Sequence, residues 1–335
     1  MINKLILIGL IAILSACKPA KDERILVTVD GEMPASEIGM TLTHEHVLVD
    51  FIGADSTGYH RWDRSEVVRQ VLPHLMELKE FGYRTMMECT PAYIGRDPVL
   101  LKILSDSSGL NLLTNTGYYG AANNQYLPDF VYRESAGELA ERWIAEWVDG
   151  IEDTGIKPGF IKIGVAGDSL SSTHEKLVRA AAITHLETGL VIASHTGPAK
   201  LAFREMEILK EEGVSAQAFI WVHAQQEKEY EKYKEAALQG AWVSLDGVSE
   251  NNITDYIERL DYMRSQDLLN RVIISHDAGW YRPGEPGGGQ FRPFTAIHEY
   301  LVPALLQRGF TDEEVQQLLI GNPASAFSIS VRMRP

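Results

Sequence analysis

Two histidines stand at alternate positions in a short hydrophobic run near the start of the chain. Residues 41–50 read TLTHEHVLVD and carry His44 and His46. If the run forms a β-strand, successive side chains point to opposite faces, so both imidazoles share one face and Glu45 lies on the other. This arrangement suits a metal ion, although two half-buried histidines with hydrogen-bond partners would explain an isolated His-x-His as well. Residues elsewhere in the chain are needed to distinguish a metal site from two structural histidines.

Further metal-binding side chains stand near the carboxyl ends of later hydrophobic runs. They are Lys162 in FIKIGV, His195 in LVIASHT, His223 in FIWVHA and Asp277 in VIISHD. Packing alone would place Val, Ile or Leu at these positions. Their recurrence at equivalent places therefore indicates one shared site. Such a site requires that these runs are strands and that their carboxyl ends converge.

The organisation of the chain predicts such convergence. Eight β-rich runs alternate with longer segments of helical character: TLTHEHV, TMMECT, NLLTNTGYY, FIKIGV, LVIASHT, FIWVHA, WVSLD and VIISHD. Residues 64–72 and 175–187, between such runs, have apolar side chains at helical spacing. Strands that alternate with helices predict βαβ units, and eight of them favour an α/β fold of the (β/α)8 TIM barrel type, with the strand ends at one mouth. Before the barrel, residues 25–31 end in Asp-Gly and predict a short N-terminal β-hairpin.

These motifs resemble the phosphotriesterase family of the amidohydrolase superfamily. The resemblance runs from the hairpin through TLTHEH, GFIKIG, VIASHT, the His223 run and ISHD to GNPA at residues 321–324. It implies a binuclear metal centre. By this resemblance His44 and His46 bind one ion together with Asp277, and His195 and His223 bind the other. A carbamylated lysine, N6-carboxylysine at position 162, bridges both ions along with a hydroxide.

Elementary chemistry is consistent with that resemblance. A lysine inside a barrel would be an unpaired buried cation, and the neutral amine that burial favours can add carbon dioxide. A salt bridge from Lys162 to a neighbouring acid is the alternative. Imidazole and carboxylate ligands suit two divalent ions, zinc first, with manganese or cobalt as alternatives. We expect the bridging hydroxide to attack the substrate and Asp277 to accept the proton.

The substrate is less well defined. Tyr119, Trp280 and Arg282 follow strand ends and are expected to contact a small-molecule substrate. Organophosphate-degrading relatives carry a His and an Asp where this chain has Gly247 and Gln226, and many lactonase relatives carry an Arg in place of Gly247. Neither marker is present. The prediction is therefore hydrolysis of a carboxylic ester or lactone, with a phosphoester next and an amide as a further alternative.

Rival functions differ in class. A deaminase on the same barrel typically uses one metal and lacks a bridging lysine, so Lys162 argues against it. A non-catalytic ligand-binding lipoprotein has no need of a pair of ions that generates hydroxide. A membrane-tethered scaffold would call for a repeat or a charged tail. His276, Glu45 and the histidines outside the strand ends are expected to have structural roles: His60, His74, His174, His185 and His298.

Composition excludes one class of partner. The chain has 335 residues, of which 45% are hydrophobic, and a formal net charge of −15. This charge would repel polyanions, so no nucleic-acid partner is expected. No low-complexity linker divides residues 25–335, which we expect to form one hydrolase domain. A homodimer is compatible with the sequence, which does not fix the oligomeric state.

The N-terminus predicts export. Residues 1–16 have a lysine followed by an apolar run too short to span a bilayer, which is typical of a signal peptide. The letters LSAC, ending at Cys17, resemble a bacterial lipobox, so Cys17 is the expected lipidation site and residues 17–24 the lipidated tether to the membrane. Because Lys18 rather than Asp follows Cys17, the expected location is the periplasmic side of the outer membrane, if the host is Gram-negative.

Overall fold

The β-rich runs form the strands of a closed parallel barrel. The computed structural model describes residues 24–334. All eight predicted runs contain strands, and the third run is divided into two short ones. The barrel strands are β3 (Met40–Leu48), β4 (Tyr83–Glu88), β5 (Asn111–Leu113), β6 (Asn115–Thr116), β7 (Phe160–Gly164), β8 (Ile192–His195), β9 (Phe219–Val222), β10 (Trp242–Leu245) and β11 (Val272–Ile274).

Two hydrogen-bonded ladders make up the barrel wall. One has the order β11-β10-β9-β8-β7-β6, and the other has the order β12-β3-β4-β5, where β12 is Gly279–Tyr281. Their strands pair in parallel. The barrel closes where the segment after β11 meets β3: the Asp277 amide donates to the His44 carbonyl at 3.1 Å, and the His46 amide donates to the Ala278 carbonyl at 3.0 Å.

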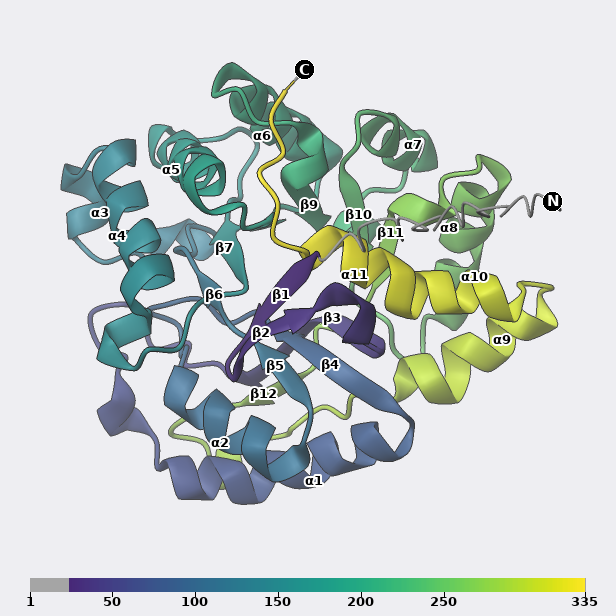
Figure 1. Cartoon of the computed structure of the whole chain (residues 1–335), viewed down its shortest axis with the longest axis horizontal. Helices are drawn as coiled ribbons and strands as arrows, with labels where there is room; N and C mark the ends of the chain where they lie inside the picture. The colour runs from purple at the N-terminus through teal and green to yellow at the C-terminus, as the bar shows by residue number, and fades with distance from the viewer. Residues whose placement is uncertain (1–23, 335) are drawn as a thin grey trace, which may run out of the picture.

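Helices cover the outside of the barrel, as Figure 1 shows. They are α1 (Arg64–Glu80), α2 (Pro98–Ser108), α3 (Phe130–Arg133), α4 (Ala136–Asp149), α5 (Ser172–Thr188), α6 (Ala199–Glu211), α7 (Tyr230–Leu238), α8 (Ile253–Ser265), α9 (Val302–Gln307), α10 (Asp312–Gln316) and α11 (Asn322–Phe327). The helical segments predicted at residues 64–72 and 175–187 lie in α1 and α5. Alternating strands and helices thus confirm the predicted (β/α)8 barrel.

The sequence of α1 explains how a helix attaches to the barrel. Asp63 caps its first turn, because its side chain accepts a hydrogen bond from the Glu66 amide. The buried side chains recur at a spacing of three or four residues, which places them on one face: Val67, Val71, Leu75 and Leu78. That face packs against the strands in the main hydrophobic core.

The predicted hairpin covers the end of the barrel at which the strands begin. Strands β1 (Ile25–Thr28) and β2 (Gly31–Pro34) pair in antiparallel register, with Thr28 opposite Gly31. Leu26 is fully buried in a cluster with Ile38, Phe160 and Phe327. In Figure 1 the hairpin, in purple, lies across the end of the barrel nearest the viewer. The amino ends of the strands are therefore covered by apolar side chains, and the carboxyl ends form the open mouth.

Candidate metal centre

The predicted ligands meet at one cavity. A hollow of about 460 Å³ is lined by side chains from the carboxyl ends of the strands. Its wall contains all six residues for which metal binding was predicted: His44, His46, Lys162, His195, His223 and Asp277. They come from β3, β7, β8 and the segments directly after β9 and β11. Residues far apart in the sequence are thus neighbours, as expected at the mouth of a barrel.

The first predicted ion site is compact. The Nε2 atoms of His44 and His46 lie 3.2 Å apart, and Asp277 Oδ1 lies 3.1 Å from His46 Nε2 and 3.8 Å from His44 Nε2. These three donor atoms are close enough together to hold one cation. His46 Nδ1 is 2.8 Å from the hydroxyl of Thr90, which donates to Glu88. This chain of hydrogen bonds fixes the ring and leaves Nε2 for a ligand role.

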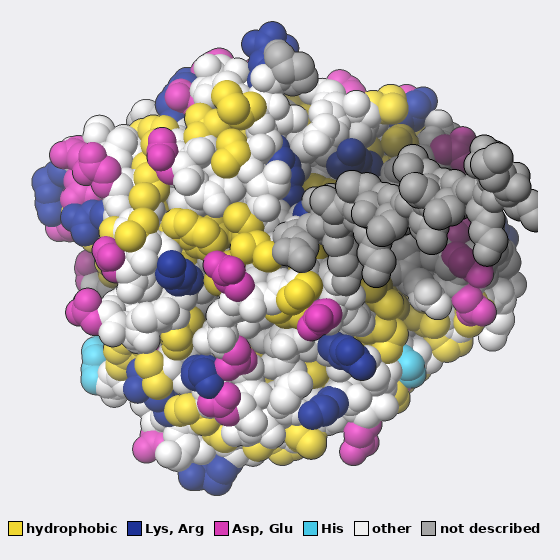
Figure 2. Space-filling model, viewed as in Figure 1, with side chains coloured by type: hydrophobic (Ala, Val, Ile, Leu, Met, Phe, Trp, Pro, Cys, Tyr) yellow, Lys and Arg dark blue, Asp and Glu magenta, His cyan; other side chains and the backbone are white. Residues whose placement is uncertain are grey.

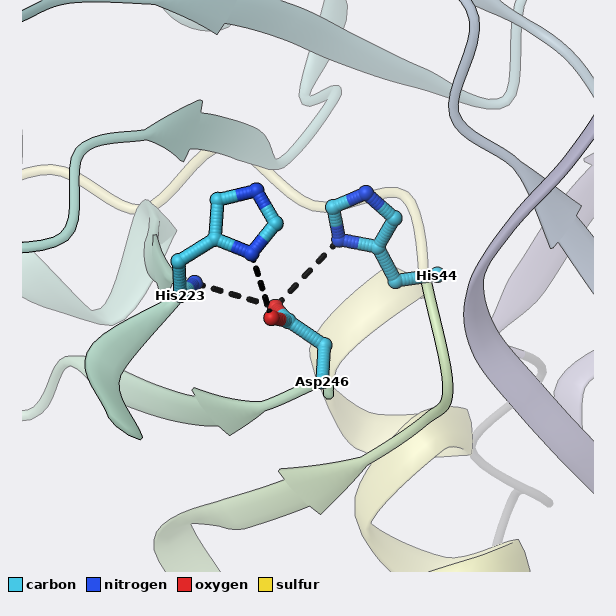
Figure 3. Close-up of side chains that lie close together, drawn as sticks. All are labelled: His44, His223 and Asp246. Carbon is cyan, nitrogen blue, oxygen red and sulfur yellow. Dashed lines mark hydrogen bonds and ion pairs between the residues drawn. The ribbon is translucent and has the colours of Figure 1, made fainter. Parts of the chain in front are cut away.

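Asp246 is the residue that the sequence analysis missed. It directly follows β10 and is fully buried. Its carboxylate lies 2.6 Å from His223 Nδ1 and 3.3 Å from His44 Nδ1, and it accepts the His223 amide at 3.0 Å (Figure 3). Both rings donate Nδ1–H to it, which leaves each Nε2 free for a ligand. The available signal was its place at the end of the run WVSLD, the same signal that identified the predicted ligands.

Charge interactions keep Asp246 ionised. Burial alone would raise its pKa, but the charges of His223 and His44 and their hydrogen bonds hold the pKa well below the usual value. For His223, burial alone would lower the pKa, but Asp246 raises it above 6.5. The pKa of His44 falls to about 4, chiefly through burial. A buried carboxylate thus orients one ring from each predicted ion site.

The second predicted ion site lies beside the first. The rings of His195 and His223 meet edge to face with centroids 4.4 Å apart, and the His44 and His223 centroids are 5.0 Å apart. Burial first, then the charges of His223 and Lys162, lower the pKa of His195 well below 6.5. The Tyr119 hydroxyl lies 3.2 Å from His195 Nδ1. A neutral imidazole is the form that binds metals.

The Lys162 amine has no partner within the described part of the chain. Its side chain is buried in the cavity wall, and among the described residues it makes no hydrogen bond or ion pair. Burial lowers its pKa. The salt bridge considered as the alternative is therefore absent from the described part of the chain. The donor set therefore consists of four imidazoles, an aspartate and a buried amine without a described partner. Its chemistry fits a centre for divalent cations.

The backbone at two predicted ligands is strained. His223 and Asp277 have φ angles of 60° and 53°, in the left-handed region. Such a conformation costs a non-glycine residue about 1–3 kcal/mol and clusters at functional sites. Glu45 fixes the segment after β11: its carboxylate accepts the backbone amides of His276 at 3.0 Å and Ala278 at 2.8 Å, on either side of Asp277. The predicted structural roles of Glu45 and His276 agree with these contacts.

The mouth of the cavity is largely aromatic. Tyr119 and Trp280 line it, as predicted for substrate contacts, together with Phe51. The Trp280 ring lies edge-on to Phe51, with centroids 5.5 Å apart. Arg282 is not part of the cavity wall: its guanidinium lies 5.7 Å from the Trp280 ring centroid and 3.5 Å from Glu285. The structure therefore brings two of the three predicted substrate contacts together.

The histidines predicted to have packing roles lie outside the cavity wall. His185 Nδ1 is 2.7 Å from the Leu190 carbonyl, and its Nε2 accepts the Arg332 amide. His174 contacts the Gly120 carbonyl at 3.0 Å. His74 and His298 stack on phenylalanine rings. These contacts are structural.

A (β/α)8 barrel with this donor set at its carboxyl end defines the class of metal-dependent hydrolases. Comparison with known families narrows the class. The model of the phosphotriesterase family matches residues 25–327, so the chain belongs to that family. The family predicted from the motifs is confirmed, and with it hydrolase activity.

Three similar proteins illustrate the relationship. The phosphotriesterase homology protein of Escherichia coli is 29% identical over 86% of this chain and 98% of its own length. The structure of an organophosphorus hydrolase from Deinococcus radiodurans has a TM-score of 0.82 and 26% identity, and covers 91% of this chain and 97% of its own. A PTE-like lactonase mutant from the same organism has a TM-score of 0.81 and 26% identity, over 90% and 100% of the two chains.

The same comparison contradicts the predicted localisation. The family match begins at residue 25, after the predicted signal peptide and tether, and the Deinococcus hydrolase is matched over 97% of its length. The prediction of an exported lipoprotein at the periplasmic side of an outer membrane is therefore wrong. Cys17, the predicted lipidation site, lies outside the described residues. Within residues 24–334, no helix is long and apolar enough to cross a bilayer.

Proposed function

We propose that the protein hydrolyses a small-molecule carboxylic ester or lactone, with two divalent ions at the mouth of the barrel. The observation that carries the proposal is the convergence of four imidazoles, Asp277 and the unpartnered Lys162 on one cavity. His44, His46 and Asp277 would hold one ion, and His195 and His223 the other. Residues 25–335 would form the hydrolase domain.

Lys162 is the proposed bridge between the two ions, as N6-carboxylysine. Its burial and lack of a described partner support this, since an unmodified ammonium would stand unpaired among four imidazoles. Zinc is the proposed metal because imidazole nitrogen and carboxylate oxygen both suit it, with manganese and cobalt as alternatives. Two such ions would supply a nucleophile at neutral pH and polarise the oxygen under attack.

The protein's own side chains have distinct tasks in this reaction. Asp277 Oδ1, at the cavity wall and 3.1 Å from His46 Nε2, would accept the proton released on attack and pass it towards the leaving group. Asp246 holds the rings of His44 and His223 in the tautomer with a free Nε2. Phe51, Tyr119 and Trp280 would contact the substrate and exclude water from the mouth.

The aromatic mouth supports a substrate with an apolar group beside the bond that breaks. The PTE-like lactonase among the structural relatives favours a lactone or ester. The organophosphorus hydrolase, equally similar in structure, favours a phosphoester as the second candidate. An amide is the remaining alternative. Nothing in the cavity favours the non-catalytic ligand-binding protein over a hydrolase.

The test is turnover of a panel of chromogenic esters, lactones and phosphotriesters by the metal-loaded protein. We expect measurable kcat/KM for at least one ester or lactone, and a loss of about a hundredfold or more in Asp277→Asn. Asp255→Asn, which changes an exposed aspartate of α8, is the matched control and should keep its activity. Saturable binding without turnover of any compound would overturn the proposal.

Metal analysis tests the bridge separately. Wild-type protein should contain two ions per chain, and Lys162→Ala should lose at least one of them. Full occupancy of both sites in Lys162→Ala would refute the bridging role while leaving the hydrolase proposal standing. The homodimer stays a prediction, to be checked by the mass of the protein in solution.

A further inference from the structure

A second cavity lies at the opposite end of the barrel from the predicted metal centre. Its volume is about 560 Å³. Trp242 is the first residue of β10 and Arg271 directly precedes β11, so both stand at amino ends of strands. The other lining residues come from α11, from the segment after it, and from the segments just before β1 and β9. The described lining is Arg24, Gln217, Trp242, Arg271, Ser325, Ser328, Ser330 and Arg332.

The charged side chains of this lining are all basic. It contains three arginines, three serines, an amide and an indole, and no Asp or Glu among the described residues. The chain as a whole has 46 acidic and 31 basic residues, so the charge of this wall is opposite in sign to the net charge of the chain. Figure 2 shows dark blue side chains on this face, in the region of α11 and the C-terminal segment. Such a wall attracts anions.

Two residues that line this cavity carry a buried N–H donor without a partner among residues 24–334. Arg332 donates through Nη2 to the carbonyls of Ser325, Ala326 and Ser328, at 3.1, 3.2 and 2.9 Å, but its buried Nη1 is unpaired among the described residues. Trp242 is 3% exposed, and its buried Nε1 is also unpaired there. An unsatisfied buried donor costs about 1–3 kcal/mol. A ligand that brings acceptors would recover that cost.

The arginines are also close enough to repel one another. Burial first, and then the charges of Arg271 and Arg24, lower the pKa of Arg332 to about 10. Neither Arg271 nor Arg332 has an ion pair with a described carboxylate. Arg271 makes one hydrogen bond, to the Gly240 carbonyl at 3.3 Å, and its guanidinium lies 5.1 Å from the Trp242 ring centroid. Its remaining N–H groups have no hydrogen-bond partner among the described residues.

We propose that this cavity binds a tetrahedral oxyanion of the phosphate class, either free phosphate or a phosphate monoester. Guanidinium groups pair with such oxygens through two parallel hydrogen bonds, and the oxyanion has enough lone pairs to accept from two arginines, the indole and the serine hydroxyls together. The site lies at the other end of the barrel from the predicted metal centre. The inference therefore does not depend on the proposed hydrolase function.

Titration calorimetry of the full-length, metal-loaded protein tests the proposal, with inorganic phosphate, methyl phosphate and acetate as probes. We expect a dissociation constant below about 1 mM for phosphate or methyl phosphate, and weaker binding of acetate. Phosphate ahead of methyl phosphate would assign the site to the free ion, and the reverse order to a monoester. Equal binding of acetate would overturn the proposed class.

Variants locate the binding. Arg271→Gln should weaken phosphate binding at least tenfold with hydrolytic activity unchanged, and Trp242→Phe should weaken it by a smaller factor because only one donor is lost. Arg84→Gln is the matched control, since Arg84 is an exposed arginine outside this cavity. Phosphate bound at the metal centre would persist in all three variants. Equal affinity in Arg271→Gln and Arg84→Gln, both melting as the wild type does, would overturn the proposal.

Discussion

At the residue scale, the orientation of two imidazoles depends on one buried carboxylate. Asp246 accepts Nδ1–H from His44 and from His223. It therefore contacts one histidine of each predicted ion site, on the side of the ring away from Nε2. The Ser244 hydroxyl also donates to it, at 2.6 Å, and so does the Gln225 amide, at 3.0 Å. The carboxylate is thus saturated with donors and is not free to bind an ion itself. Its role is to position the rings.

Asp246→Asn should disrupt this arrangement without a large change in shape. An asparagine amide group would face one Nδ1–H donor with another donor, so one ring has to change its tautomer or turn. We expect a fall of about 10- to 100-fold in metal affinity, as is typical when a partner of a metal-binding histidine is removed. Competition with a chelator measures it, and Asp255→Asn serves as the control. Unchanged metal affinity would contradict the positioning role.

A second buried carboxyl lies behind His195. Glu205, on α6, accepts hydrogen bonds from the hydroxyls of Ser194 and Thr196, the two neighbours of His195. Burial raises its pKa from 4.5 to about 8. Since the folded state holds this proton more tightly than the unfolded state, the contribution to stability is complete below pH 4.5 and is lost as the pH rises towards 8.

Glu205→Gln should therefore flatten the pH dependence of stability. Between pH 5 and pH 8 the free energy of unfolding of the wild type should decrease relative to that of Glu205→Gln, since glutamine does not ionise. Urea unfolding of the metal-free proteins at the two pH values measures the difference, and the comparison cancels the titration of the histidines that both share. Parallel pH profiles would show that Glu205 is ionised throughout.

At the element scale, the hairpin β1–β2 covers the end of the barrel where the strands have their amino ends. Leu26 is fully buried against the interior side chains at the amino ends of the strands. Leu26→Ala should lower the free energy of unfolding by about 2–5 kcal/mol, through lost burial and the cavity that remains. Glu32→Ala, on the exposed strand of the same hairpin, should change it by less than about 0.5 kcal/mol. Denaturant unfolding measures both, and equal effects would mean that the hairpin does not contribute through Leu26.

Much of this arrangement was predictable from local pattern. The alternation of β-rich and helical segments defines the barrel, and each predicted ligand interrupts an apolar run where packing alone would favour Val or Ile. Asp246 carries the same signal at the end of WVSLD. The left-handed backbone at His223 and Asp277 has no local signal, because neither residue is a glycine. The arginine-lined cavity also has none, since Trp242, Arg271 and Arg332 meet only through the tertiary fold.

At the scale of the whole molecule, the predicted metal centre lies on the seam of the barrel. His44 and His46 stand on β3, in one ladder. His195 stands on β8, in the other ladder, and His223 directly follows β9 of that ladder. Asp277 lies on the segment between β11 and β12, and its amide donates to the carbonyl of His44 on β3. Any cation held by these side chains would cross-link the two ladders, so metal content and global stability should be coupled.

Removal of the ions should therefore destabilise the entire barrel rather than the mouth alone. A ligand at a hundred times its dissociation constant stabilises the folded state by about 2.7 kcal/mol, so chelation should lower Tm by several degrees in a single cooperative transition. Calorimetry of metal-loaded and chelated protein measures the shift. Asp277→Asn should show a smaller shift, because it lacks one of the side chains proposed to hold the ions. An identical Tm with and without chelator would mean that the seam closes through its backbone hydrogen bonds alone.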